Sequence, residues 1–92
     1  MLTPYKTTEV FDENTLPAAL RREHRTKAGV WGVIRVSKGE VRLFLADGND
    51  AMVLTPDRPG LVLPEQTHYV EPLGEVRMWV EFYNSRPIEF SR

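Results

Sequence analysis

The sequence contains no cysteine, which excludes disulfide bonds, thiolate nucleophiles and zinc sites built on cysteine. It also lacks a long apolar run: nothing approaches the roughly 20 apolar residues that span a bilayer, and residues 1–6 lack the apolar core of a secretion signal. Neither sign of charge dominates, since 12 Lys and Arg residues balance 13 Asp and Glu residues. We therefore expect a cytoplasmic protein with no nucleic-acid partner and no membrane partner.

The length predicts a single domain. A chain of 92 residues leaves no room for a second one, so we expect one domain over residues 1–92, with a barrel over about residues 5–83 and a tail over residues 84–92. A domain of this size buries only about 60–65% of the surface of its unfolded chain. Pairing with a second copy would bury more surface, so we expect a homodimer.

The spacing of apolar residues predicts strands. Residues 30–38 are rich in Val, Ile and Trp, and residues 41–46 and 76–83 alternate between apolar and other side chains. Shorter runs of the same type occupy residues 5–10, 51–54, 61–63 and 68–71. Turn signals separate them at residues 11–14, 37–40, 47–50, 56–60 and 72–75.

Two of these turns predict hairpins, and one region is harder to assign. The turns at residues 37–40 and 47–50 each join neighbouring strands into a hairpin. Residues 15–19 predict a short helical turn, and residues 20–24 a strand that ends at His24. About eight short strands separated by regular turns are typical of an all-β sandwich or barrel.

Several motifs resemble a known family. They are His-x-Thr-Lys-x-Gly-Val-Trp-Gly at residues 24–32, Val-x-x-Gly at 36–39, Pro-x-x-x-His-x-Val-Glu at 64–71 and Val-Glu-Phe-Tyr at 80–83. Together they resemble the small cupin-like domain related to tellurite-resistance protein B, over about residues 5–83. That domain occurs alone or ahead of a methyltransferase. The resemblance implies a double-stranded β-helix, the jelly-roll barrel of cupins, and no Gly-rich motif for S-adenosylmethionine follows here.

The two histidines are the first candidates for a functional site. We expect His24 and His68 to meet inside the barrel and bind one divalent metal ion, Zn, Fe or Ni, with Glu81 as the first choice for a carboxylate ligand. The alternative is that both histidines cap turns through hydrogen bonds to the backbone. The resemblance implies a weakened metal site, because Thr26 stands where the cupin motif has its second histidine. We expect no nucleotide cofactor.

Other side chains are candidates for binding a small molecule. Lys27, beside Arg25, would attract an anion to the barrel mouth, and the Thr26 hydroxyl would contact a ligand or, alternatively, satisfy the turn. The aromatic residues Trp31, Trp79 and Tyr83 would line the pocket or belong to the core.

Three functions remain open at this point. The first is a binding module for a metal ion or a small anion, the second is a metal-dependent enzyme that acts on a small molecule, and the third is a barrel with a vestigial site that works through protein contacts. The sequence favours the first and third, because the second histidine and the glutamate of the cupin metal motif are missing.

Overall fold

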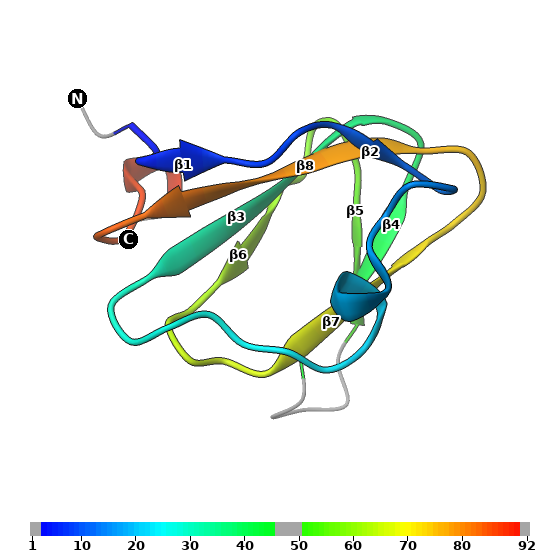
Figure 1. Cartoon of the computed structure of the whole chain (residues 1–92). Coiled ribbons are helices and arrows are strands. Elements are labelled where there is room, and N and C mark those ends of the chain that lie inside the picture. The colour runs from blue at the N-terminus through cyan, green and yellow to red at the C-terminus, as the bar shows by residue number, and fades with distance from the viewer. Residues whose placement is uncertain (1–2, 46–50, 91–92) are drawn as a thin grey trace.

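The structure is a computed structural model that describes residues 3–45 and 51–90. Two antiparallel sheets face each other (Figure 1). The larger sheet is built around β3 (Trp31–Lys38) and β8 (Arg77–Tyr83), which pair with Ile34 opposite Val80. These are the two longest β-type runs of the sequence, so their pairing gives this sheet its centre.

Short strands complete the larger sheet on both sides of this pair. On the β8 side, β1 (Lys6–Thr7) and β2 (Phe11–Asp12) pair with successive parts of β8. On the other side, β6 (Gly60–Val62) pairs with β3. Pro59 precedes β6 and Pro64 follows it closely, which keeps this strand short.

The smaller sheet has three strands in the order β5-β4-β7. Its centre is β4 (Val41–Leu45), between β5 (Ala51–Leu54) and β7 (His68–Pro72). The two sheets enclose one apolar core, because alternate residues of their strands point inward. The buried core residues are Phe11, Leu16, Ile34, Val36, Val41, Leu43, Leu54, Val62, Val70, Val76, Met78 and Val80.

The turn at Gly39 carries the chain from one sheet to the other. Gly39 has φ +76°, and a Cβ atom there would lie 2.1 Å from the backbone oxygen of Glu75. The predicted hairpin between residues 30–38 and 41–46 is therefore wrong: β3 pairs with β6 and β8, whereas β4 pairs with β5 and β7. The second hairpin joins β4 and β5, and its predicted turn at residues 47–50 lies outside the described residues.

The N-terminal third differs most from the sequence prediction. The strand expected over residues 5–10 is reduced to β1, and the turn expected at residues 11–14 begins with β2. The expected strand over residues 20–24 is absent: a 3₁₀ helix, η1 (Ala18–Arg21), occupies part of it, and only His24 forms a β-bridge. A second 3₁₀ helix, η2 (Ile88–Phe90), lies in the tail, which folds back so that Arg86 stacks on Trp31.

The fold is all-β, as predicted, but the two sheets stay open. No ladder of strand pairs joins them within residues 3–45 and 51–90, so these residues do not form the closed cupin barrel that the sequence suggested. An apolar helix of the length needed to cross a membrane is absent from the same residues.

Candidate functional site

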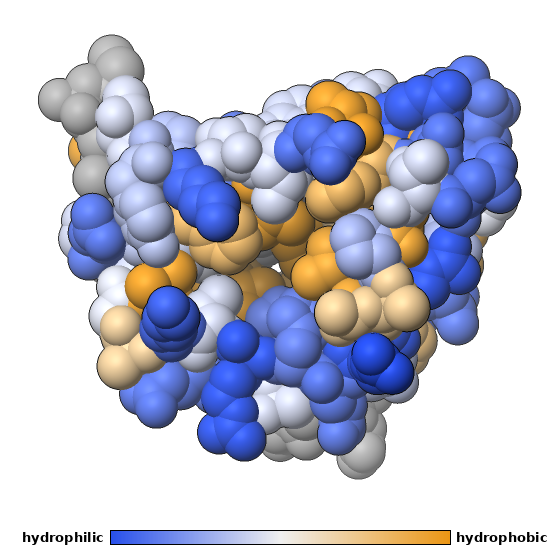
Figure 2. Space-filling model, viewed as in Figure 1, coloured by the Kyte–Doolittle hydropathy of each residue, from blue (hydrophilic) through white to orange (hydrophobic). Residues whose placement is uncertain are grey.

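A cavity of about 440 Å³ lies between the two sheets, a volume in the range of small-molecule sites. The loop between η1 and β3 borders its opening, and Figure 2 shows apolar surface inside the hollow with hydrophilic surface along its edge. The lining residues are Tyr5, Lys6, Thr8, Leu20, His24, Arg25, Thr26, Lys27, Val30, Gly32, Ile34, Val62, His68, Val70, Met78, Val80 and Phe82.

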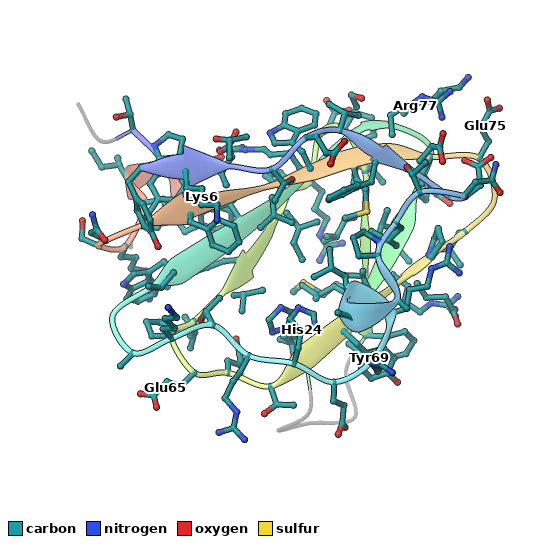
Figure 3. The ribbon with its side chains drawn as sticks, viewed as in Figure 1. Lys6, His24, Glu65, Tyr69, Glu75 and Arg77 are labelled. Carbon is teal, nitrogen blue, oxygen red and sulfur yellow. The ribbon has the colours of Figure 1, made fainter. Side chains whose placement is uncertain are left out.

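The two histidines meet at this cavity, as the sequence predicted. Their ring centroids are 4.1 Å apart with the ring planes tilted by 56°, and Figure 3 shows the His24 ring directed into the hollow. The backbone brings them together, because each residue's amide donates a hydrogen bond to the other's carbonyl oxygen, at 3.0 and 2.9 Å. This bridge attaches the loop after η1 to the start of β7.

Both histidines also make the backbone contacts that the alternative interpretation expected. The Nδ1 atom of His24 lies 2.9 Å from the carbonyl oxygen of Arg22, and that of His68 lies 2.8 Å from the carbonyl oxygen of Gln66. A carbonyl oxygen only accepts, so each Nδ1 carries the proton and donates it. In a neutral imidazole the Nε2 atom is then an acceptor with a free lone pair.

Both Nε2 atoms reach open space. Neither has a hydrogen-bond partner among the described residues, and no side-chain nitrogen or oxygen of those residues is buried without a partner. His68 is only 5% exposed, so the space that its Nε2 reaches is the cavity that it lines. Burial lowers the pKa of His68, the carbonyl of Gln66 opposes this, and the neighbouring His24 lowers it further, so the ring stays neutral near pH 7.

Positive charge gathers around the cavity. Lys6 on β1 and Arg25 and Lys27 in the loop line it, and the lining contains no Asp or Glu. None of these three cations forms an ion pair within residues 3–45 and 51–90. Thr26 also lines the cavity, but its hydroxyl donates to the carbonyl of Val30 at 2.9 Å, so it satisfies the turn as the alternative interpretation expected.

Glu81 does not join the histidines. It lies on β8 between Val80 and Phe82, which line the cavity, so its side chain points to the opposite face of the sheet. There its carboxylate accepts hydrogen bonds from Arg35 at 3.0 Å, Trp79 at 3.0 Å and Tyr83 at 2.8 Å. Burial would raise the pKa of Glu81, but these hydrogen bonds and the charge of Arg35 outweigh it, so the pKa is lowered.

The three aromatic candidates are on this outer face too. Trp79 and Tyr83 bind Glu81, and Trp31 lies under Arg86, whose guanidinium carbon is 5.2 Å from the ring centre. None of the three lines the cavity. Sequence reasoning missed Lys6 and the apolar wall; the wall residues Met78, Val80 and Phe82 share one face of an alternating run, which is the signal that could have found them.

Comparison with known proteins identifies the family. A family model described as the TehB-like domain matches residues 6–80. The chain belongs to the TehB-like domain family. The resemblance to tellurite-resistance protein B is thereby confirmed; the wider cupin relation is not, because neither this match nor the open sheets support it.

Two relatives show how the TehB-like domain occurs elsewhere. Curated proteins of Haemophilus influenzae, named probable S-adenosyl-L-methionine-dependent methyltransferase TehB, are 30% identical over 96% of this chain. The chain spans only 33% of their length. The crystal structure of TehB from Haemophilus influenzae superposes with a TM-score of 0.81 at 30% identity, over 89% of this chain and 31% of that one.

In a second crystal structure, the same fold accounts for nearly the whole chain. This protein of Escherichia coli strain K12 superposes with a TM-score of 0.82, over 94% of this chain and 92% of that chain. The two sequences are 18% identical, so the likeness concerns the fold alone. The TehB-like fold thus makes up nearly all of one chain and about a third of another.

The predicted divalent metal cofactor is wrong. The relatives are named as methyltransferases that depend on S-adenosylmethionine, and residues 3–45 and 51–90 contain no group of three or more His, Asp or Glu residues placed to hold a metal ion. The physical reason is the position of Glu81, which puts the expected third ligand on the far side of the sheet from the histidine pair.

The cavity does not fit S-adenosylmethionine either. That cofactor carries a sulfonium cation, whereas this cavity has three cationic side chains and no carboxylate. The usual site for it begins with a Gly-rich turn between a strand and a helix. The described residues form antiparallel sheets and two 3₁₀ helices instead. The described residues therefore do not form a methyl-transfer site of this kind.

Proposed function

We propose that this chain serves S-adenosylmethionine-dependent methyl transfer of the TehB type as a domain that binds a small organic anion. The methyl donor would be held by a methyltransferase unit outside the cavity, in the same polypeptide or in another chain. The observation that carries the proposal is the cavity itself, with its apolar wall, its histidine pair and its rim of three unpaired cations within the described residues.

The family relation supports the link to methylation. The chain matches about a third of proteins named as methyltransferases, and the chain itself has a small-molecule cavity that is unsuited to the cofactor. A binding role complements a methyltransferase unit, because that unit needs an acceptor molecule or a signal that such a molecule is present. This role keeps the small-anion part of the function inferred from the sequence and omits the metal.

A chimera tests the proposal. The third of Haemophilus influenzae TehB that matches this chain is replaced by this chain, and methyl transfer from labelled S-adenosylmethionine and growth on tellurite are measured in a host without its own TehB. We expect the chimera to exceed a TehB truncated by the same third. A chimera no better than the truncated protein, or a truncated protein as active as the whole one, contradicts the proposal.

Matched variants show whether the cavity matters in this chimera. Lys27→Gln removes a rim cation, whereas Lys38→Gln removes an exposed cation that pairs with Glu75 at 3.1 Å and does not line the cavity. We expect the first substitution to lower growth on tellurite and the second to leave it unchanged. Equal effects of the two substitutions would contradict a role of the cavity in the proposed function.

A further inference from the structure

The histidine pair narrows the proposed function to one class of ligand. The Nδ1 atoms of both imidazoles donate to backbone carbonyl oxygens, so their Nε2 atoms are left to accept in a space whose wall is largely apolar. We infer that the cavity recognises a hydroxylated organic acid, whose hydroxyl donates to the Nε2 atoms of His24 and His68 while its carboxylate meets the rim cations. This inference rests on the proposed function, because it names the class of molecule that the same cavity binds.

The backbone fixes the polarity of the imidazoles. Each Nδ1–H is held by a carbonyl oxygen, of Arg22 or of Gln66, so a rotation that would present Nδ1 to the cavity breaks a hydrogen bond of 2.9 or 2.8 Å. Burial of His68 further favours the neutral form, which has one acceptor and no second donor. A ligand that fills the cavity without a donor would leave these acceptors buried and unpaired, which is costly.

The cations define a second group on the ligand. Lys6, Arg25 and Lys27 come from β1 and from the loop at the opening, and the lining has no carboxylate that could neutralise them. A carboxylate gains from such a rim both by attraction and by charge-assisted hydrogen bonds. Elsewhere in the lining, Ile34, Val62 and Val70 offer only apolar contacts, so the body of the ligand is apolar.

Matched ligand pairs test the donor. The probes are para-hydroxyphenylacetate with para-methylphenylacetate, and a medium-chain ω-hydroxy fatty acid with the acid that carries a methyl group in place of the hydroxyl. Their affinities for the full chain are measured by calorimetry at pH 7.5. We expect the hydroxylated member of at least one pair to bind at least about tenfold more tightly, because the methyl group leaves both acceptors unpaired.

Charge and the imidazoles are tested in the same way. The neutral amide para-hydroxyphenylacetamide should bind more weakly than the acid at low salt, and the difference should shrink as salt is added. His24→Phe removes one acceptor and leaves the backbone bridge, so the preference for hydroxyl over methyl should fall at least about threefold. Lys38→Gln is the control and should leave every affinity unchanged.

A spectroscopic measurement makes the inference testable without any ligand. The ¹⁵N NMR shifts of histidine-labelled protein report which ring nitrogen carries the proton, and we expect Nδ1 in both residues near pH 7.5. Four results would each overturn the inference. Two concern the imidazoles: a protonated Nε2, or binding that strengthens as the imidazoles become charged. The other two concern the probes: equal binding of the hydroxyl and methyl members, or no binding of any probe at millimolar concentration. The proposed role in methylation would survive these outcomes, since the chimera measures it independently.

Discussion

Glu81 shows how much a single side chain contributes on the outer face of the larger sheet. Its side chain is 16% exposed and accepts hydrogen bonds from Arg35, Trp79 and Tyr83. Arg35 also binds Glu89 through two contacts, which ties the C-terminal tail to β3. The carboxylate of Glu81, predicted from the sequence as a metal ligand, thus has its partners in this network.

The substitution Glu81→Gln should destabilise the protein by about 1–3 kcal/mol, because it leaves Arg35 short of a partner and removes an acceptor from the network. Urea unfolding followed by tryptophan fluorescence measures this. Glu71→Gln is the control: Glu71 is 53% exposed and lies 3.5 Å from Arg42, so its loss should cost less than about 0.5 kcal/mol. Similar losses in the two variants would contradict the role given to Glu81.

His68 should make stability depend on pH. Its pKa is lowered in the folded protein, so between the folded pKa and the ordinary value of 6.5 the unfolded chain binds more protons. The contribution of His68 to the free energy of unfolding is therefore complete above pH 6.5. Below that pH the free energy of unfolding decreases, by up to about 1.4 kcal/mol per pH unit. Thermal unfolding between pH 7.5 and 5.5 measures this, and His68→Asn should flatten the profile. A profile that rises toward pH 5.5 would contradict the assignment.

At the scale of elements, the corner between β3 and β4 should be the position least tolerant of a side chain. In Gly39→Ala the new Cβ would clash with the carbonyl oxygen of Glu75, 2.1 Å away, so we expect a loss above about 2 kcal/mol. Gly29 has a similar φ of +79° but nothing within 4 Å of a Cβ, so Gly29→Ala should cost only about 1 kcal/mol. Chemical unfolding compares the two, and equal losses would mean that crowding is unimportant.

The strands could be predicted from the sequence, but their sheets could not. Residues 30–38, 51–54 and 76–83 agree closely with β3, β5 and β8, because their composition and alternation are local properties. The pairing of β3 with β8 joins residues 39 to 52 positions apart and is not local. A tight turn at Gly39 therefore predicts a hairpin, whereas in the structure it is a corner between sheets.

The alternation of apolar and other side chains also predicts the two faces of β8, but it does not indicate which face lines the cavity. The alternation over residues 76–83 places Trp79, Glu81 and Tyr83 on one face of the strand, and in the structure Arg35 and the tail lie on this face. Strand β1 is only two residues long, so Lys6 gave no periodic signal for its place at the cavity. The meeting of His24 with His68 could be predicted because each belongs to a recognisable motif, at residues 24–32 and 64–71.

At the scale of the whole molecule, self-association remains a prediction. A chain of 10.6 kDa buries limited surface by itself, and exposed apolar side chains such as Val10 and Ile88 remain available. Sedimentation equilibrium at micromolar concentration should therefore give twice the mass of the chain. The mass of a single chain would contradict the expected homodimer.

The bridge between His24 and His68 has a consequence for observing the cavity. The same two residues that line the hollow hold its loop through a reciprocal pair of amide hydrogen bonds. A molecule lodged against both rings would oppose the separation of this pair, so the two amide protons should exchange with deuterated water more slowly, and by a common factor. Occupancy could then be followed at two backbone positions, whatever reaction the bound molecule later undergoes.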